Sequence, residues 1–598
     1  MNDAPSEKPG PWSPGISSAI PERYLPLATI YRSENVFTSL QQARELADFT
    51  GLAPHSLVAF RPERLIVHEV LIRVMAELSV PDGKVYEDLG INFRRMVGII
   101  VSKYVAPERT AIVAAFDGLC DRARQVFDAQ IEAALSPASA IAKPAGQGGW
   151  LSRLIGRTQT GAAASDPAQN RESREDELAT RWLAAATASD DPAEAAAYQS
   201  LAQTLAAIVG KRGRLVGDAE LLTGLAMRDF SNGYGSKFIG DRLTALVHRA
   251  ARAEGFKILP AQKKPVIMNV KGASAAGKST LRPQQKHLAE VLGLDWTDFA
   301  LISPDIFRKY LLDYASLDEA IRYAGSLTGH ELEIVDLKLD DYMAAKAARG
   351  DMPHLLIDRF RFDSFSPQAN EAQGGRLLTR FGDVVYMFFV ITPPAETVER
   401  AWLRGQQVGR YKAVDDLLYH NIEAFSGMPG LFFTWALREG KQVHYEFLDN
   451  SVKKGDRPRT VAFGINGQIN IFDIPAMLNV DRYKRVNVDA GSRDEVFLSQ
   501  DDMSPERNTG FLKECFRRLD AVRLADQATG EVYAWIEQGA AVAVNHVALR
   551  HALRSADVRE ALAVVMPALI DDAEGLEQRC SELDSDDPHT LGAWGGRT

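Results

Sequence analysis

The sequence predicts an α/β protein with a parallel sheet core, preceded by a mainly helical N-terminal region and followed by a small α+β region. Three observations lead to this prediction. Short apolar runs alternate with helical patterns between residues 261 and 475, which is typical of a parallel sheet. Apolar residues recur at helical spacing through much of the first 260 residues. After residue 475, hairpin-like and helix-like runs are mixed in a shorter region.

Length and composition limit the class of protein. The chain has 598 residues, too many for one ordinary domain, and its apolar content of 46% is that of a globular protein. The net charge of −10 argues against a protein that binds nucleic acid in bulk. No secretory signal and no run of the ~20 apolar residues that would span a bilayer is visible. We therefore expect a cytoplasmic protein, although an effector-type export signal without hydrophobic character would leave no such trace.

Composition shifts divide the chain into seven predicted segments. Residues 136–178 are rich in small and polar side chains and cannot bury a core. The predicted segments are a disordered N-terminus (1–20), a helical domain (21–135), a low-complexity linker or insertion (136–178), a helical region (179–260), the parallel-sheet domain (261–475), a C-terminal α+β region (476–583) and a frayed tail (584–598).

One stretch of the parallel-sheet domain carries the strongest chemical signal. Residues 266–270 predict a buried strand, and a helical pattern runs from Lys278 to about Leu292. Between them stands G-x-x-x-x-G-K-S, which is a phosphate-binding loop in its strand–loop–helix setting and indicates a P-loop NTPase-type core. We expect Lys278 to contact the β/γ-phosphates of ATP and Ser279 to hold Mg²⁺; the alternative is a strand-to-helix turn that binds nothing. The predicted cofactor-binding residues are Gly272, Ala273, Ser274, Ala275, Ala276, Gly277, Lys278, Ser279 and Thr280.

Four further apolar runs predict the other strands of this sheet. They are Phe299–Ser303, His354–Asp358, Val384–Ile391 and Val443–Leu448, and a hairpin with an Asn466-Gly467 turn follows them. Ligands of parallel sheets bind at the carboxyl ends of the strands. Chemistry is therefore expected at the polar residues that lie just past those ends: Asp305, Asp358, Thr392, Asp449 and Asn450.

Asp305 is the predicted catalytic base. Ser303 suits the N-cap of a helix, and Pro304 suits its first position, so Asp305 falls in the first turn beside the end of the second strand. There its carboxylate would orient and deprotonate an acceptor hydroxyl, in a reaction that depends more on positioning than on a strong base. The alternative is a carboxylate that only complements the helix dipole.

Asp358 ends the run His354–Asp358 and is the predicted acidic ligand of Mg²⁺, bound directly or through water. A strand-end turn residue is the alternative for this position. In the segment that follows, Arg359, Arg361 and Asp363 would share one face of an extended chain. They would line an anionic substrate pocket or, equally well, form a solvated face.

A run of arginines predicts a lid over the phosphates. Arg400 and Arg404 lie on one side of a predicted helix, Gly405 and Gly409 are expected to break it, and Arg410 follows on a mobile loop. Guanidinium groups brought over ATP neutralise charge on the transferring phosphoryl group. Basic residues that stabilise the end of a helix are the alternative.

These motifs together resemble the zeta toxin kinases. The resemblance covers residues 262–455 and rests on the phosphate loop, Ser303–Arg308, the arginines of Arg400–Arg410 and Leu448–Ser451. Kinases that resemble this set phosphorylate a sugar hydroxyl of a nucleotide-type molecule, which is UDP-N-acetylglucosamine in the typical toxins and a dinucleotide in an effector branch. The resemblance implies that Lys278 and Ser279 hold ATP·Mg²⁺, that Asp305 is the base, that Arg404 and Arg410 clamp phosphates and that Arg308 helps to hold the acceptor.

The expectation is therefore an ATP-dependent phosphotransferase whose P-loop kinase domain (261–475) acts on a hydroxyl of a small, nucleotide-sugar or dinucleotide-like molecule. A kinase acting on a protein or nucleic-acid end is one alternative, and a nucleotide-binding switch or scaffold with little turnover is another. The long helical N-terminal half departs from the compact toxins. It could inhibit the kinase in the same chain, bind an antitoxin or other partner protein, or form part of the acceptor site.

Overall fold

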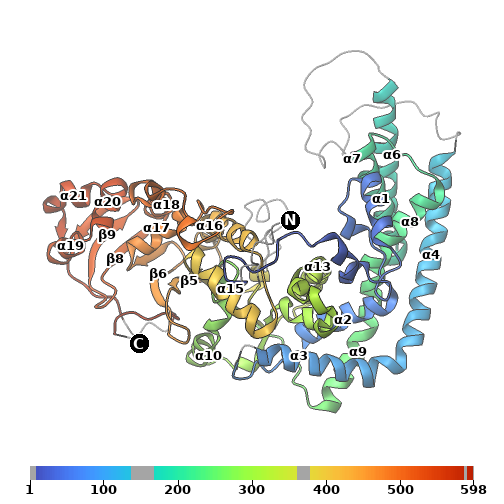
Figure 1. The fold of residues 1–598 in the computed structure, drawn as a ribbon, viewed down its shortest axis with the longest axis horizontal. Coiled ribbons are helices and arrows are strands. Elements are labelled where there is room, and N and C mark those ends of the chain that lie inside the picture. The colour runs from blue at the N-terminus through green and yellow to red at the C-terminus, as the bar shows by residue number, and fades with distance from the viewer. Residues whose placement is uncertain (1–8, 86, 137–166, 360–377, 585–588, 597–598) are drawn as a thin grey trace, which may run out of the picture.

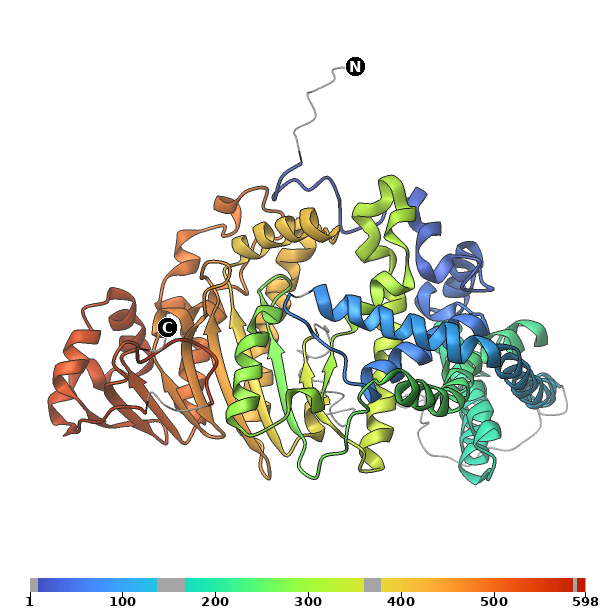
Figure 2. The same cartoon turned by 90° about the horizontal axis from the view of Figure 1, so that it is seen from below.

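The fold is built on one large mixed sheet with helices around it, as seen in a computed structural model that describes residues 9–85, 87–136, 167–359, 378–584 and 589–596. The sheet has eleven strands in the order β11-β10-β9-β8-β7-β6-β5-β4-β1-β3-β2. It lies toward one end of the molecule, and most of the N-terminal helices lie at the other (Figures 1 and 2). The predicted α/β architecture is confirmed at this level.

Five parallel strands form the half of the sheet nearest the helices. They are β1 (Val266–Lys271), β2 (Phe299–Ile302), β3 (His354–Ile357), β4 (Val384–Ile391) and β5 (Gln442–Asp449). Strand β1 is central and pairs with β3 on one side and β4 on the other. All predicted strands of this part are confirmed, because their nearly continuous apolar sequences are buried on both faces.

The connections of the parallel strands contain most of the helices that cover them. The longer ones are α10 (Arg282–Val291), α13 (Gly329–Ala348), α15 (Pro394–Val408) and α16 (Val414–Ala436). From β1 the chain moves to β2 and β3 on one side, and it then crosses to β4 and β5 on the other. Ligands of open parallel sheets bind where the strand order reverses in this way, at the carboxyl edge.

Six further strands extend the same sheet beyond β5. They are β6 (Arg459–Ile465), β7 (Gln468–Ile471), β8 (Ala521–Ala525), β9 (Val532–Glu537), β10 (Ala540–Val544) and β11 (Glu577–Gln578). The predicted β6–β7 hairpin is confirmed, and Asn466 in its turn has a positive φ of 46°. The C-terminal helices are α17 (Ile474–Arg482), α18 (Gly510–Arg518), α19 (His546–Ala552), α20 (Ala556–Val565) and α21 (Ala568–Asp571). Because β8 pairs with β7, the C-terminal α+β region continues the central sheet.

The N-terminal region is helical, as predicted. Its α-helices are α1 (Leu40–Thr50), α2 (Pro62–Glu77), α3 (Glu87–Ile99), α4 (Arg109–Leu135), α6 (Pro167–Ala188), α7 (Pro192–Arg212), α8 (Ala219–Phe230) and α9 (Ser236–Glu254). Helix α6 begins inside the predicted linker 136–178, so that prediction is wrong for its last part, and residues 137–166 lie outside the described chain. Helices α4, α6, α7 and α8 share one apolar cluster, whereas α2, α3 and α9 pack into the core of the sheet.

Buried ion pairs join α2 to α13. Glu331 of α13 accepts hydrogen bonds from Arg64 Nε at 2.5 Å and pairs with His68 Nε2 at 2.7 Å. Lys346, near the other end of α13, donates to Glu77 at 2.9 Å. A charge taken out of water is tolerated only when it is paired. These pairs therefore specify how the helical region sits on the parallel part of the sheet.

Residues at both ends of the chain make contacts that their composition did not predict. In residues 9–20, predicted to be disordered, the Pro14 carbonyl accepts from Arg322 Nη1 at 3.1 Å, and Ser18 Oγ donates to Asp415 at 2.6 Å. In residues 589–596, predicted to fray, Leu591 and Trp594 are buried. Both predictions are wrong for these residues, because fixed partners elsewhere in the fold hold segments that have no regular secondary structure.

The carboxylate of Glu446 in β5 explains the order of the C-terminal segment. It is fully buried, and it accepts hydrogen bonds from the backbone N–H groups of Leu591 at 2.6 Å and Gly592 at 2.9 Å. Burial nevertheless raises the pKa of Glu446 to about 7. Residues 589–596 thus supply hydrogen-bond donors that the buried Glu446 carboxylate needs.

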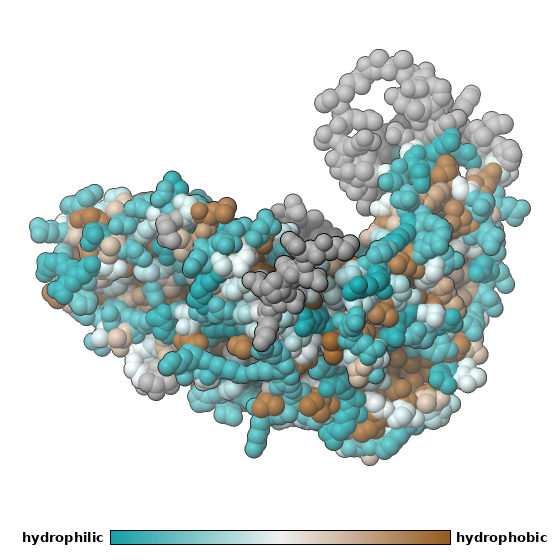
Figure 3. All heavy atoms as spheres, in the orientation of Figure 1, coloured by the Kyte–Doolittle hydropathy of each residue, from teal (hydrophilic) through white to brown (hydrophobic). Residues whose placement is uncertain are grey.

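On the face drawn in Figure 3, hydrophobic residues lie in separate patches among hydrophilic ones. Within the described residues, no helix combines the length and the apolar character that crossing a membrane requires.

Candidate functional site

The loop from Gly272 to Thr280 lies directly after the central strand β1, at the carboxyl edge of the parallel strands. A side chain at position 272 would place its Cβ 3.0 Å from the Val390 carbonyl oxygen. At position 277, φ is +92° and a Cβ would lie 2.2 Å from the Asn450 amide nitrogen. Gly277 is therefore required by its backbone conformation and by the segment after β5, whereas a side chain at Gly272 would make a tight contact with β4.

Two polar residues at neighbouring strand ends hold this loop. Thr392 Oγ1 and Asn450 Nδ2 both donate to the Ala276 carbonyl, at 3.0 and 2.7 Å. Asp449, the third polar residue of this group, instead accepts from the backbone N–H and hydroxyl of Ser451. The structure thus brings Thr392 and Asn450 to the loop, as the strand-end argument predicted, and shows that they position its backbone.

Lys278 lies against its own loop. Its Nζ donates to the carbonyls of Gly272 and Ala273 at 3.0 and 2.9 Å. Burial lowers the pKa of Lys278 to about 8, against the opposing effect of the carboxylates of Asp358 and Asp305. The predicted helix begins at Lys278 as a 3-10 turn (Lys278–Leu281) and continues as α10. The hydroxyl-bearing neighbour Ser279 is partly buried in that first turn.

Asp305 is held by two arginines. It lies in a 3-10 turn (Pro304–Phe307) after β2, where Oδ1 accepts from Arg308 Nε at 2.9 Å and Oδ2 accepts from Arg410 Nη2 at 2.5 Å. Burial favours its neutral form, yet the two guanidinium groups hold the pKa of Asp305 well below its usual range. Ser303 is the N-cap of this turn and Pro304 lies at its start, as predicted, but the Ser303 side chain makes no capping hydrogen bond. Ion pairs, rather than a side-chain cap, aim this carboxylate.

Arg308 connects Asp305 to the start of α13. Its Nη1 donates to the Gly325 carbonyl at 2.5 Å and to Thr328 Oγ1 at 2.8 Å. In this arrangement Arg308 binds protein groups on both sides, and it links the candidate base to the turn that precedes α13. Its predicted contact with an acceptor stays a prediction.

Asp358 lies beside Arg282 at the end of β3, as the sequence predicted for a strand-end carboxylate. Its Oδ2 is 3.6 Å from Arg282 Nη2, and its backbone N–H donates to the Ile302 carbonyl at 3.0 Å. The charge of Asp358 also acts on Lys278, since it raises the pKa of that lysine. This places the predicted Mg²⁺ ligand close to the loop.

Arg359 turns to α13. Its two terminal nitrogens donate to Asp336 at 2.7 Å and Asp340 at 2.5 Å, and all three side chains are buried. These contacts contradict the prediction that Arg359 lines an anionic substrate pocket, because its guanidinium neutralises two carboxylates of the fold. Arg361 and Asp363 lie outside the described residues.

The segment predicted to form an arginine-bearing lid begins on α15. This helix runs through Gly405 and ends only at Gly409, whose φ is +74°, so the prediction that Gly405 breaks the helix is wrong. Gly405 is buried because the Tyr411 ring lies where its side chain would be, with a Cβ 2.3 Å from that ring. Arg404 stands on the same helix, and Arg410 follows its end and reaches Asp305. Both guanidinium charges act on Lys278, where they lower its pKa.

A second charged group behind the lid was not predicted. Lys412 Nζ lies 2.8 Å from Asp416 Oδ2 and 2.5 Å from His420 Nδ1. Burial lowers the pKa of Lys412 to about 8 and that of His420 to about 3. Lys412, Asp416 and His420 follow one another at intervals of four residues, on and just before α16. This spacing is the sequence signal that would have identified the group.

Arg400, the first arginine of the lid, ties α15 to the segment after β5. Its Nη2 donates to Glu396 Oε2 at 2.8 Å and to the Asn450 carbonyl at 2.7 Å. Asn450 therefore contacts both the lid helix and the loop.

The carboxyl edge thus gathers a glycine-bearing loop, one lysine, two strand-end carboxylates and the arginines of a lid. Such a set can bind an anion through backbone N–H groups and cations, and can hold an acidic group beside it. Comparison of the chain with protein-family models, curated proteins and solved structures finds no match.

Proposed function

We propose that this protein is an ATP-dependent phosphotransferase of zeta-toxin type, which transfers the γ-phosphoryl group of ATP to a hydroxyl of a nucleotide-sugar or dinucleotide-like molecule. The observation that carries the proposal is the meeting of Lys278, Asp305 and Asp358 at one edge of the sheet, where each carboxylate affects the pKa of the lysine. These groups come from the ends of three different strands, β1, β2 and β3.

The loop residues fit a nucleotide phosphate chain. Position 277 leaves no room for a side chain and position 272 leaves little, and the chain after Gly277 enters a helical turn whose first N–H groups have no intrahelical partner. On binding, the Lys278 ammonium would exchange the loop carbonyls for phosphate oxygens, with Arg404 and Arg410 approaching from the lid. Ser279 and Asp358 would hold Mg²⁺, which supplies further neutralisation of phosphate charge.

Asp305 supports acceptor activation by its position. With a pKa far below neutrality it is ionised throughout the physiological range, so it acts mainly by orienting the acceptor hydroxyl and taking its proton late in the reaction. Arg410 joins this carboxylate to the lid. Closure of the lid over ATP would therefore move Arg410 from the base to the phosphoryl group and open one carboxylate oxygen to the acceptor.

The test is transfer of labelled phosphate. The full-length protein is incubated with γ-labelled ATP, Mg²⁺ and a metabolite extract, and labelled products are identified by mass spectrometry. We expect a labelled small molecule that is absent with Lys278→Ala and strongly reduced with Asp305→Asn. ATP binding without any labelled product, in extracts that support a control kinase, would contradict the proposal.

One observation favours a second candidate, a nucleotide-dependent switch with little turnover. Arg308 connects Asp305 to the turn before α13, and Glu331 near the start of α13 binds α2 of the helical region. A change at the loop could thus be passed to the helical half. A switch would bind ATP, alter hydrogen exchange in α2 and produce no labelled acceptor.

A further inference from the structure

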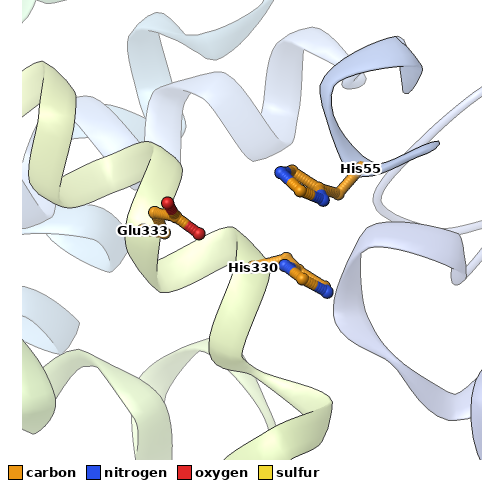
Figure 4. Close-up of side chains that lie close together, drawn as sticks. All are labelled: His55, His330 and Glu333. Carbon is orange, nitrogen blue, oxygen red and sulfur yellow. The ribbon is translucent and has the colours of Figure 1, made fainter. Parts of the chain in front are cut away.

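Three side chains of types that can bind a metal ion lie close together where the helical region contacts α13 (Figure 4). His55 lies in the 3-10 turn Pro54–Leu57, and His330 and Glu333 lie one turn apart on α13. One ligand atom from each residue lies within 4.8 Å of the other two. The imidazole rings are stacked with centroids 4.2 Å apart and planes 9° apart, and the Glu333 carboxylate lies to the same side of both rings.

Both supporting segments are fixed by contacts of their own. The chain after His55 is held by Asn232, which donates from Nδ2 to the Val58 carbonyl at 2.7 Å and accepts from the Phe60 N–H at 3.2 Å. The first turn of α13 is anchored by the buried pairs of Glu331, next to His330, with α2. The backbone segments that carry the ligand groups are therefore held in place on both sides of the site.

We propose that His55, His330 and Glu333 bind one divalent transition-metal ion of the zinc class. Two imidazoles and one carboxylate form a ligand set that zinc accepts with a water in the fourth position, whereas Mg²⁺ and Ca²⁺ prefer oxygen ligands throughout. His330 and Glu333 are exposed, which leaves room for that water. Tetrahedral ligand atoms lie about 3.4 Å apart for bonds of ~2.1 Å. The three ligand atoms lie within 4.8 Å of one another in the structure, and rotation of the side chains would bring them to the distances that zinc requires.

Binding at this site would link the turn at His55 to α13 and add a connection between the helical region and the parallel part of the sheet. The same helix carries Glu331 and Lys346, which already bind α2. A metal that binds the folded chain and not the unfolded chain raises the stability of the folded state. The site therefore predicts a metal-dependent rise in melting temperature, which can be measured without any knowledge of enzymatic activity.

The experiment uses the full-length chain after removal of metal with EDTA. It is titrated with Co²⁺ and followed by visible absorption, competition with Zn²⁺ gives the zinc affinity, and native mass spectrometry gives the stoichiometry. We expect one equivalent bound with the absorption of a four-coordinate nitrogen–oxygen site, and a rise in melting temperature with Zn²⁺. His55→Ala and His330→Ala should each weaken binding by at least about tenfold, while His287→Ala, exposed on α10, should not.

Glu333→Gln separates the carboxylate's role from the packing of the rings, because it keeps the size of the side chain and removes its charge. It should weaken binding and leave the circular-dichroism spectrum and the metal-free melting temperature unchanged. The proposal is overturned if the chain binds no Co²⁺ or Zn²⁺, or if the two histidine variants bind as tightly as the His287→Ala control.

Discussion

At the scale of single residues, the candidate site is a set of charges held close together before any ligand arrives. Lys278 rests on the loop carbonyls, and Asp305 is held between Arg308 and Arg410. The pKa of the lysine is lowered by burial, and that of the aspartate is held down by its arginines in spite of burial. In the proposed function each of these groups exchanges protein partners for ligand atoms, which makes their individual substitution informative.

Lys278→Ala should remove productive use of ATP while the fold is retained. In the proposed function the ammonium binds the phosphates, whereas in the structure it donates to the carbonyls of Gly272 and Ala273 in its own loop. Loss of a charged donor aimed at the transferring group lowers the rate by about 10²–10³-fold. Single-turnover transfer measures the effect, and Lys264→Ala, an exposed lysine just before β1, is the control. Normal transfer by Lys278→Ala would refute the phosphate-loop assignment.

The lowered pKa of Lys278 predicts a pH effect on ATP binding. Without ligand the lysine loses its proton near pH 8, and the phosphates should favour its return. Below pH 7, ATP binding should be accompanied by no proton uptake at Lys278. Well above pH 8, ATP binding should be accompanied by uptake of about one proton, and the affinity for ATP should fall by up to about tenfold for each unit by which the pH rises. Calorimetry in buffers of different ionisation heat measures the uptake, and Lys278→Arg should abolish it. Equal proton uptake at pH 7 and pH 9 would show that the lysine does not titrate as described.

Asp305→Asn should lose phosphoryl transfer by about 10²–10⁴-fold with near-normal ATP affinity. In the proposed reaction the acceptor hydroxyl needs this carboxylate, whereas the nucleotide does not. Calorimetry gives the ATP affinity and single-turnover transfer gives the rate, with the exposed Asp351→Asn as control. A variant that transfers at the normal rate excludes Asp305 as the base, and a variant that also loses ATP binding assigns it to the metal site.

At the scale of elements, the segment proposed as a lid depends on the fit between α15 and the residues that follow it. Helix α15 continues through Gly405 because the Tyr411 ring packs against the bare backbone there, and the chain turns back only at Gly409. This packing sets the direction in which Arg410 leaves the helix and reaches Asp305. The small residue in the middle of α15 thus determines where an arginine after the helix is placed.

Gly405→Ala should therefore impair transfer through the position of Arg410. The new methyl group would overlap the Tyr411 ring, and overpacking of this kind costs about 1–3 kcal/mol. We expect a lower single-turnover rate with ATP affinity largely retained. Gly118→Ala is the matched control, since it lies in α4 with open space around it and should stabilise or leave the fold unchanged. Unchanged transfer by Gly405→Ala would mean that the lid does not rely on this contact.

At the scale of the whole molecule, the helical region and the sheet behave as connected parts. Helices α2, α3 and α9 share the main apolar cluster with the strands, and buried charges bind α2 to α13. Burial opposes the ionisation of Glu331, the residue of α13 that binds α2, but Arg64 and His68 hold its pKa down to about 2. The stability that its charge contributes is present above its ordinary pKa and is lost only as the pH falls toward 2.

Glu331→Gln should destabilise the protein strongly at neutral pH. It removes the charge that Arg64 and His68 face and leaves a buried guanidinium without its counter-charge, which costs roughly 3–5 kcal/mol. Thermal and urea unfolding measure the change, and Glu439→Gln, an exposed acid in the turn before β5, is the control. Equal stability of the two variants would show that this pair does not hold the helical region to the sheet.

The sequence by itself determined the parallel strands, the β6–β7 hairpin and the helical N-terminal region. These features depend on local apolar spacing and on turn residues such as Asn466-Gly467, which lie within a few positions of one another. The loop at Gly272–Thr280 was predictable for the same reason, since strand, glycines and helix are consecutive. The strand-end rule also selected Thr392 and Asn450 before their contacts with Ala276 were known.

Only the tertiary structure decided what joins distant segments. Arg410 binds Asp305 across 105 positions, Leu591 binds Glu446 across 145, and Arg359 is paired with carboxylates of α13. Local patterns misassigned Gly405 and the C-terminal segment, because a helix break or a frayed end is settled by whichever partner the rest of the fold brings near. Composition describes what a segment can do alone, whereas the pairing of buried charges and donors depends on packing between elements far apart in the chain.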